Sequence, residues 1–183
     1  MNTTSPSQDY SSIAKLLHWL MAILIIAAFI LGSQAADIEG ITPTKIKFIN
    51  WHKWLGVTIF GLAGLRLLWR MFNTPPANPA GMPVWQAKAS SATHMIFYFL
   101  FFALPVTGYF YSLASGYPIV YLGLFKLPVL IEKNKELADQ LIEVHELFAN
   151  GLLALFIVHV AAALKHHFID RDNVLTRMLP KFK

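Results

Sequence analysis

Two histidines, His145 and His159, lie fourteen residues apart in the last long apolar segment of this chain, and earlier apolar segments contain His18 and His52. Fourteen residues is close to four turns of α-helix, so both imidazoles leave the same helix face, about 21 Å apart along the axis. Histidine in a lipid-embedded helix is costly to bury without a partner, and it therefore marks a functional site. Four such histidines at matched depths predict axial ligands for two stacked haems.

Four apolar segments must position these histidines. Each is long enough to cross a bilayer, which takes about 20 mostly apolar residues, and they cover roughly residues 13–33, 48–72, 91–113 and 141–168. The composition fits a membrane home, because 56% of the residues are hydrophobic and only 14% are charged, against about 25% charged in soluble domains. The chain, residues 1–183, therefore predicts a single all-α membrane domain, a four-transmembrane-helix bundle surrounded by lipid.

The ends and loops carry weaker signals. The polar start, residues 1–10, has no positive run, and no cleavage pattern follows at a convincing distance, so we expect the first span to be retained. The stretch between the third and fourth spans is long enough for a short amphipathic helix at the membrane interface. Lys and Arg are more frequent, and acidic residues rarer, on the side with both termini, which predicts that this side is cytoplasmic.

This topology sorts the four histidines by depth. His18 and His159 lie near the cytoplasmic ends of the first and last spans, whereas His52 and His145 lie near the far ends. A haem needs axial nitrogens on opposite faces of its ring, which two facing helices can supply. The chain contains no cysteine, so covalent attachment through a Cys-x-x-Cys-His motif is excluded. We expect two non-covalent b-type haems with both axial positions filled, suited to electron transfer.

Two residues lie at the level of the opposite pair on their own helices. Gly32 is fourteen residues after His18, and Arg66 is fourteen residues after His52. Gly32 has no side chain and is expected either to make room for a porphyrin or to pack against another helix. Arg66 is a candidate contact for haem propionates or a quinone oxygen, although with Arg70 it also fits positive-inside anchoring.

Two further histidines are expected at the cytoplasmic surface. His166 lies seven residues beyond His159, on nearly the same stripe, and His94 begins the third span. Quinone reduction takes up protons with electrons, so a protonatable pair there is a candidate quinone site that supplies protons. An interfacial position without a further role is the alternative for both. His94 could also serve as a haem ligand in place of His18.

Other interpretations of the four ligand histidines are isolated, hydrogen-bonded membrane histidines or a zinc or copper site. Sites for those metals usually gather their ligands at one depth, often with carboxylates. Here two pairs lie about four turns apart, and the spans hold almost no carboxylate besides Glu146. Lysines on the far side could attract an anionic electron donor, but acidic residues share that side, so no steering field is established.

Several motifs together resemble the bacterial cytochrome b561 family over nearly the whole chain. The matching stretches are Lys15-Leu-Leu-His18-Trp19, Asn50-Trp-His52, Leu65-Arg66-Leu-Leu-Trp-Arg70, Asn73-Thr-Pro-Pro76, the span from His94 to Gly108, and the C-terminal run from His145-Glu146 through His166-His167 to Pro180. The combination is specific, although no single stretch is. The chain departs from the family in the proline loop, where related chains can carry lysines and this one has Ala80 and Gly81.

The resemblance implies a four-helix, di-haem b protein of the bacterial inner membrane that exchanges electrons with ubiquinone. By position, the family's haem ligands correspond to His18, His52, His145 and His159. The family's candidate quinone residues correspond to His94 and His166. At least one branch of the family resembles superoxide oxidases, so the resemblance implies a superoxide:ubiquinone oxidoreductase that releases oxygen on the outer side. The alternatives are a cytochrome b subunit that serves a partner dehydrogenase or hydrogenase and, from another class, a histidine-based membrane metal transporter or anchor. We expect no nucleic-acid partner and leave a homo-oligomer open.

Overall fold

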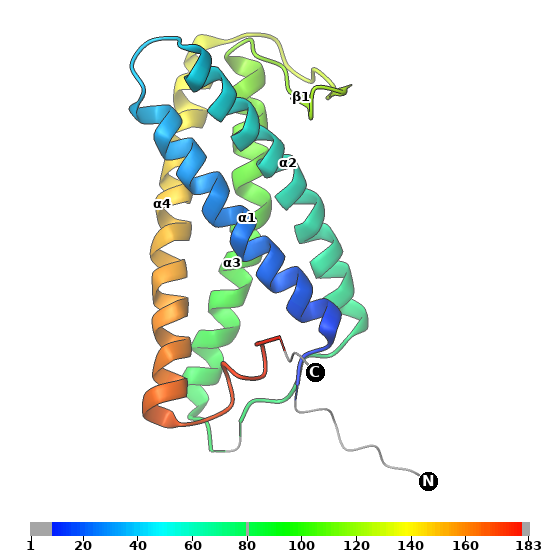
Figure 1. The fold of residues 1–183 in the computed structure, drawn as a ribbon, viewed down its shortest axis with the longest axis vertical. Coiled ribbons are helices and arrows are strands. Elements are labelled where there is room, and N and C mark those ends of the chain that lie inside the picture. Colours follow the sequence, from blue (N-terminus) through cyan, green and yellow to red (C-terminus); the bar gives the residue numbers. More distant parts are fainter. Residues whose placement is uncertain (1–8, 80, 181–183) are drawn as a thin grey trace.

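The computed structural model of this chain describes residues 9–79 and 81–180 and consists of four long helices (Figure 1). These are α1 Ser12–Asp37, α2 Pro43–Phe72, α3 Val84–Ala114 and α4 Lys135–Lys165. Each lies in a segment long and apolar enough to cross a membrane, which confirms the expected all-α membrane fold. Each helix begins before the apolar span outlined by the sequence, because polar first turns also become helical. The predictions for residues 1–10 and for Ala80 fall largely outside the described residues.

Local sequence sets where the helices begin. The side chains of Ser11, Thr42 and Asn134 each accept a hydrogen bond from a backbone N–H three residues further on, at 3.3, 3.1 and 3.0 Å. Such N-caps satisfy donors that the first helical turn leaves free. Pro43 follows Thr42 at a position where a missing N–H costs nothing. α3 continues through Pro105. Proline has no N–H to donate, but a membrane bundle tolerates this because neighbouring helices can satisfy the freed backbone group.

The bundle is built from two helix hairpins. α1 packs mainly against α2, α3 packs mainly against α4, and the contact between α2 and α3 joins the two hairpins. Small residues in the shared core, Ala28 and Ala63 among them, let the backbones approach closely. α1 and α4 make few close backbone contacts. The outward faces of the helices carry many exposed apolar side chains, as expected for contact with lipid.

The stretch between α3 and α4 contradicts one prediction. In place of an amphipathic helix it contains a two-stranded antiparallel hairpin, β1 Val120–Tyr121 and β2 Phe125–Lys126. The three-residue turn between the paired Tyr121 and Phe125 places Leu122 and Gly123 at positive φ, 52° and 75°, a backbone form that glycine adopts readily and other residues rarely do. The Trp54 indole N–H donates to the carbonyl of the first residue of β1 at 2.7 Å, which holds the hairpin against α2.

After α4 the chain makes one π-helical turn, His166–Asp170, and folds back beneath the bundle (Figure 1). The Trp19 indole N–H donates to the Met178 carbonyl at 2.9 Å. The buried Arg177 guanidinium donates to the Ala77 carbonyl at 2.7 Å. The tail, the start of α1 and the α2–α3 loop therefore lie at one end of the bundle, called here the terminal end. The hairpin and the α1–α2 loop lie at the other, called the hairpin end.

Candidate functional site

Toward the hairpin end, His52 of α2 faces His145 of α4, with ring centroids 6.0 Å apart and planes at 79°. The Nδ1 atom of His52 is 2.8 Å from the Ala28 carbonyl oxygen, and that of His145 is 3.1 Å from the Leu104 carbonyl oxygen. A carbonyl oxygen only accepts, so both Nδ1 atoms carry the proton and donate it. This tautomer leaves the Nε2 lone pair of each ring free to bind a metal.

Two glycines make room for these rings. A Cβ at Gly32 would lie 3.0 Å from Cε1 and Nδ1 of His52, and a Cβ at Gly108 would lie 3.0 Å from Cε1 of His145. The space beside Gly32, expected for a porphyrin, is therefore taken by an imidazole. The close approach of Gly108 to the His145 ring was not predicted. Its signal was present, because Gly108 lies fourteen residues after His94, as Gly32 does after His18.

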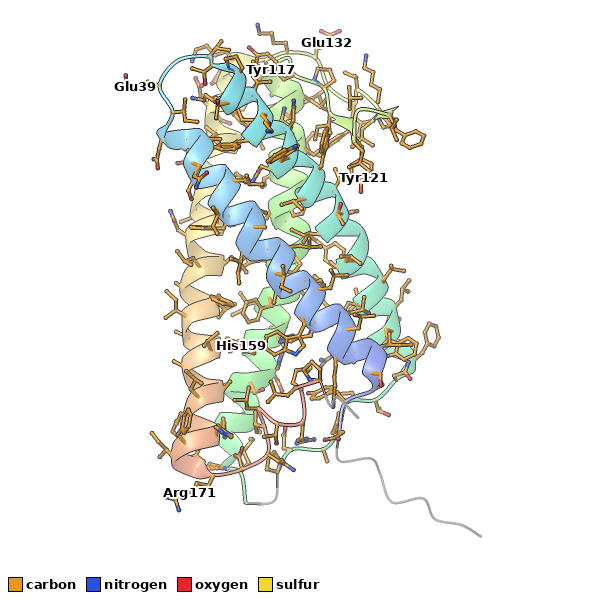
Figure 2. All side chains as sticks on the ribbon, viewed as in Figure 1. Glu39, Tyr117, Tyr121, Glu132, His159 and Arg171 are labelled. Carbon is orange, nitrogen blue, oxygen red and sulfur yellow. The ribbon has the colours of Figure 1, made fainter. Side chains whose placement is uncertain are left out.

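Toward the terminal end, His18 of α1 and His159 of α4 face each other with ring centroids 6.2 Å apart. His159 points from α4 into the bundle, in the half of the bundle that is nearer to Arg171 (Figure 2). The His94 ring of α3 also lies 6.0 Å from the His159 ring, so distance alone does not separate His18 from His94 as its partner. The structure thus brings three of the predicted histidines together at this level.

Both facing pairs fit a bis-imidazole haem. Metal–nitrogen bonds of about 2 Å, and about 1.1 Å from each nitrogen to its ring centre, separate two axial rings by about 6 Å. The observed separations, 6.2 and 6.0 Å, match this value. Imidazole is the ligand that b-type haem iron takes in electron-transfer sites. The residues present therefore suit a haem at each level, held without covalent attachment.

Arg66 stands beside the terminal-end pair. Its Nη2 atom is 3.1 Å from Nδ1 of His18. Arg66 also lines a cavity of about 480 Å³ between α2, α3, the start of α1 and the tail, to which Arg70 contributes as well.

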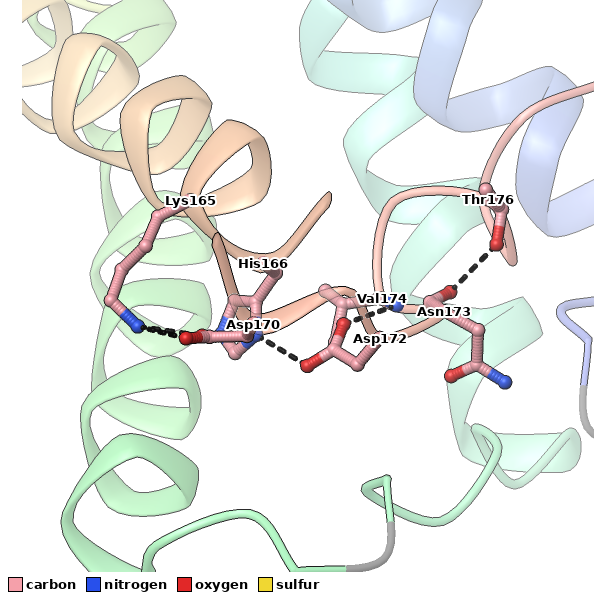
Figure 3. Close-up of polar contacts among 7 residues, drawn as sticks. All are labelled: Lys165, His166, Asp170, Asp172, Asn173, Val174 and Thr176. Atoms are coloured by element: carbon pink, nitrogen blue, oxygen red, sulfur yellow. Dashed lines mark hydrogen bonds and ion pairs between the residues drawn. The ribbon is translucent and has the colours of Figure 1, made fainter. Parts of the chain in front are cut away.

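His166 lies in the π-helical turn after α4. Its Nδ1 atom is 2.6 Å from Oδ2 of Asp172 and 3.3 Å from Oδ2 of Asp170 (Figure 3). Lys165 binds both oxygens of the Asp170 carboxylate at 2.7 and 2.6 Å. The three potential metal ligands lie close enough together to share an ion, but the lysine already supplies a cation there. The imidazole and the two aspartates thus form a hydrogen-bonded cluster where α4 ends.

Comparison with known proteins agrees with this geometry. The family model for prokaryotic cytochrome b561 matches residues 9–181. The chain is 33% identical to cytochrome b561 homolog 2 of Escherichia coli K12, covering 99% of this chain and 96% of the relative. It is 30% identical to cytochrome b561 homolog 1 of the same organism over the whole of both chains.

A third relative, a probable superoxide oxidase CybB of Yersinia pestis, is 32% identical, covering 95% of this chain and 97% of the relative. The match to the family model spans nearly the whole chain, and two of these relatives exceed 30% identity over nearly their full length. The four membrane helices and the paired histidines agree with that match. This chain therefore belongs to the prokaryotic cytochrome b561 family of b-haem proteins that transfer electrons in membranes.

Proposed function

We propose that this protein carries electrons across the bacterial inner membrane from superoxide, at the hairpin end, to ubiquinone, at the terminal end. The observation that carries the proposal is that two pairs of histidines face each other at two levels of one bundle. Within each pair the ring centroids are 6.0 Å (His52 and His145) and 6.2 Å (His18 and His159) apart. Because α4 is unbroken between His145 and His159, the two levels are about 21 Å apart along its axis. The excess of Lys and Arg at the terminal end supports a cytoplasmic position for that end.

Each pair would hold one haem b, a group that with two imidazole ligands exchanges single electrons and leaves no coordination position for oxygen. The protein's own part is to fix the ligands. The Ala28 and Leu104 carbonyls hold His52 and His145 in the ligating tautomer. α4 supplies one ligand to each pair and so sets the distance between them.

The hairpin end offers one cation, Lys53, near the pair formed by His52 and His145. Lys53 directly follows His52, and its ammonium lies 3.4 Å from the Tyr117 carbonyl, so a cation is held beside this pair. A fixed cation raises the local concentration of an anionic substrate. Two superoxide ions would give two molecules of oxygen, and their two electrons with two protons would convert one ubiquinone to ubiquinol. The similarity to a probable superoxide oxidase of Yersinia pestis supports this donor.

The terminal end offers groups that could supply those protons. His94 lies beside His159, and His166 is hydrogen-bonded to Asp172. A positioned acid typically contributes about 10²–10⁴-fold to a reaction that needs a proton. We assign His94 and His166 to the quinone site in this sense, as proton donors.

The test is a turnover assay with the purified protein and its haem absorbance as readout. An enzymatic source supplies superoxide, and a short-chain ubiquinone is the acceptor. We expect superoxide to reduce the haems, ubiquinone to reoxidise them, and about two superoxide ions to be consumed per ubiquinol. Added superoxide dismutase should abolish the reduction. If dithionite reduces the haems but superoxide does not, superoxide is not the donor, and co-purification of a soluble subunit would then indicate a partner dehydrogenase.

A further inference from the structure

The cavity at the terminal end contains two guanidinium groups from one face of α2. Arg66 and Arg70 are four residues apart and both line it, together with Trp69 and Tyr98. The Arg70 guanidinium lies 6.0 Å from the centre of the Tyr98 ring. Like charges four residues apart on a helix repel each other, so this arrangement calls for an anion between or beside them.

The described lining of the cavity offers one carboxylate, that of Asp9, for these two guanidinium groups. Neither Arg66 nor Arg70 forms an ion pair with a carboxylate in residues 9–79 and 81–180, whereas Asp9, at the edge of the cavity, pairs with Lys15 at 4.0 Å. A guanidinium inside a membrane-spanning helix is costly unless its charge is matched and its N–H groups have acceptors. Two guanidinium groups thus meet one carboxylate in this cavity, which leaves a net positive charge among its described lining residues.

The contact between Arg66 and His18 sharpens this argument. A guanidinium can only donate hydrogen bonds, so Nδ1 of His18 must be the acceptor in that contact. When Nε2 of a neutral imidazole binds a metal, Nδ1 carries the proton and becomes a donor. Two donors cannot bond to each other. Ligation of His18 therefore frees the Arg66 N–H groups for another acceptor, and the cavity lies directly beside them.

We propose that Arg66 and Arg70 bind the two propionate carboxylates of the haem held by His18 and His159. This inference rests on the proposed haem at that level. Two fixed cations match two carboxylates, whereas a quinone is neutral before reduction and would leave both charges unmatched. Paired guanidinium–carboxylate contacts are charge-assisted and roughly twice as strong as neutral hydrogen bonds. Tyr98 lines the same cavity and adds a polar hydroxyl to it.

The first experiment locates the effect. Arg66→Gln and Arg70→Gln are compared with Arg171→Gln, which removes the same charge from an exposed residue at the same end of the bundle. Spectroelectrochemical titration should show the midpoint of one haem falling, because loss of a nearby cation favours the oxidised form. A tenfold change in the reduction equilibrium, about 59 mV for one electron, is expected for the cavity variants and little change for Arg171→Gln.

The second experiment identifies the anion. Full-length protein and each variant are reconstituted with haem b or with its dimethyl ester, in which both carboxylates are blocked. With haem b, Arg70→Gln should release one of the two haems about tenfold faster; with the ester it should make less than about a twofold difference, a non-additive result that marks a direct pair. Arg66→Lys, which keeps the charge, serves if Arg66→Gln does not hold haem.

Two results would overturn the proposal. Equal effects of Arg70→Gln on retention of haem b and of the ester would show that the carboxylates are not the partners. A rise in KM for ubiquinone with unchanged midpoints and unchanged haem retention would assign the cavity to the quinone. Protein with no bound haem at this level, even without substitutions, would mean that the proposed function itself had failed.

Discussion

The two levels of the bundle are built on one plan but filled differently. Each helix contributes one residue to each level, fourteen residues apart. The hairpin-end level is made of Gly32, His52, Gly108 and His145. The terminal-end level is made of His18, Arg66, His94 and His159. Two histidines with two glycines thus stand at one level, and three histidines with one arginine stand at the other.

The difference shows how the same ligand pair can be given different surroundings. At the hairpin end, backbone carbonyls fix the tautomer of both rings, and glycines leave only the space that the rings need. At the terminal end, His18 contacts a charged side chain, and in the described residues no hydrogen bond is made by His159. We expect the first level to be the more rigid, because the backbone fixes both of its rings. The second level contains a charged side chain, Arg66, that borders a cavity.

The largest expected effect comes from removing one ligand at each level. His145→Leu and His159→Leu should each lower bound haem from two per chain to about one, because an axial site without its imidazole holds haem weakly. Haem per protein, measured as the pyridine haemochrome, checks this. At the terminal end, His18→Leu should lose haem and His94→Leu should retain it. The reverse outcome would make His94 the ligand and redraw the terminal-end level.

The next effect separates electron exit from haem binding. His166→Leu should keep both haems and slow ubiquinone reduction by about 10²-fold, the lower end of what a positioned proton donor contributes. His167→Leu, at the neighbouring position, is the matched control, because the His167 ring contacts only Phe168 among the described ring contacts. Stopped-flow reoxidation of prereduced haem by ubiquinone provides the rates. Equal rates in the two variants would remove His166 from the quinone site.

A smaller effect tests whether the hairpin end is the rigid level. Gly32→Ala and Gly108→Ala place a Cβ 3.0 Å from a ligand ring, and such overpacking typically costs about 1–3 kcal/mol. Gly61→Ala and Gly151→Ala are the controls, since a Cβ there meets nothing within 4 Å. Thermal unfolding of the haem-loaded protein should separate the two sets. If all four variants unfold alike, the glycines do not constrain the histidines.

The smallest effect concerns electron entry. Lys53→Gln should lower the second-order rate with superoxide by about two- to fivefold at low salt, and added salt should reduce the difference, because screening weakens attraction between separated charges. Lys126→Gln, on strand β2, is the control. Haem reduction by pulsed superoxide measures both rates. A larger loss for Lys126→Gln would move the entry point from His52 toward the hairpin.

Part of this arrangement could be predicted from the sequence and part could not. The four helices follow from long apolar stretches, and the facing of His145 and His159 to one side follows from the helical period. The loop before α4 was predicted wrongly, because its length and mixed polarity do not distinguish a helix from a hairpin. Leu122 and Gly123 at positive φ decide for the hairpin. Gly108 was missed because the fourteen-residue spacing was not applied to His94.

The sequence by itself determined the spacing of the histidines along each helix, because that spacing depends only on a periodic backbone. It also determined the membrane fold, because apolar length and the scarcity of charge are properties of composition. Only the tertiary structure decided which carbonyl accepts from which imidazole, that Arg66 contacts His18, and that His166 pairs with Asp172. These contacts join residues from different helices or across an irregular turn. Their geometry depends on how the helices pack, which no local pattern encodes.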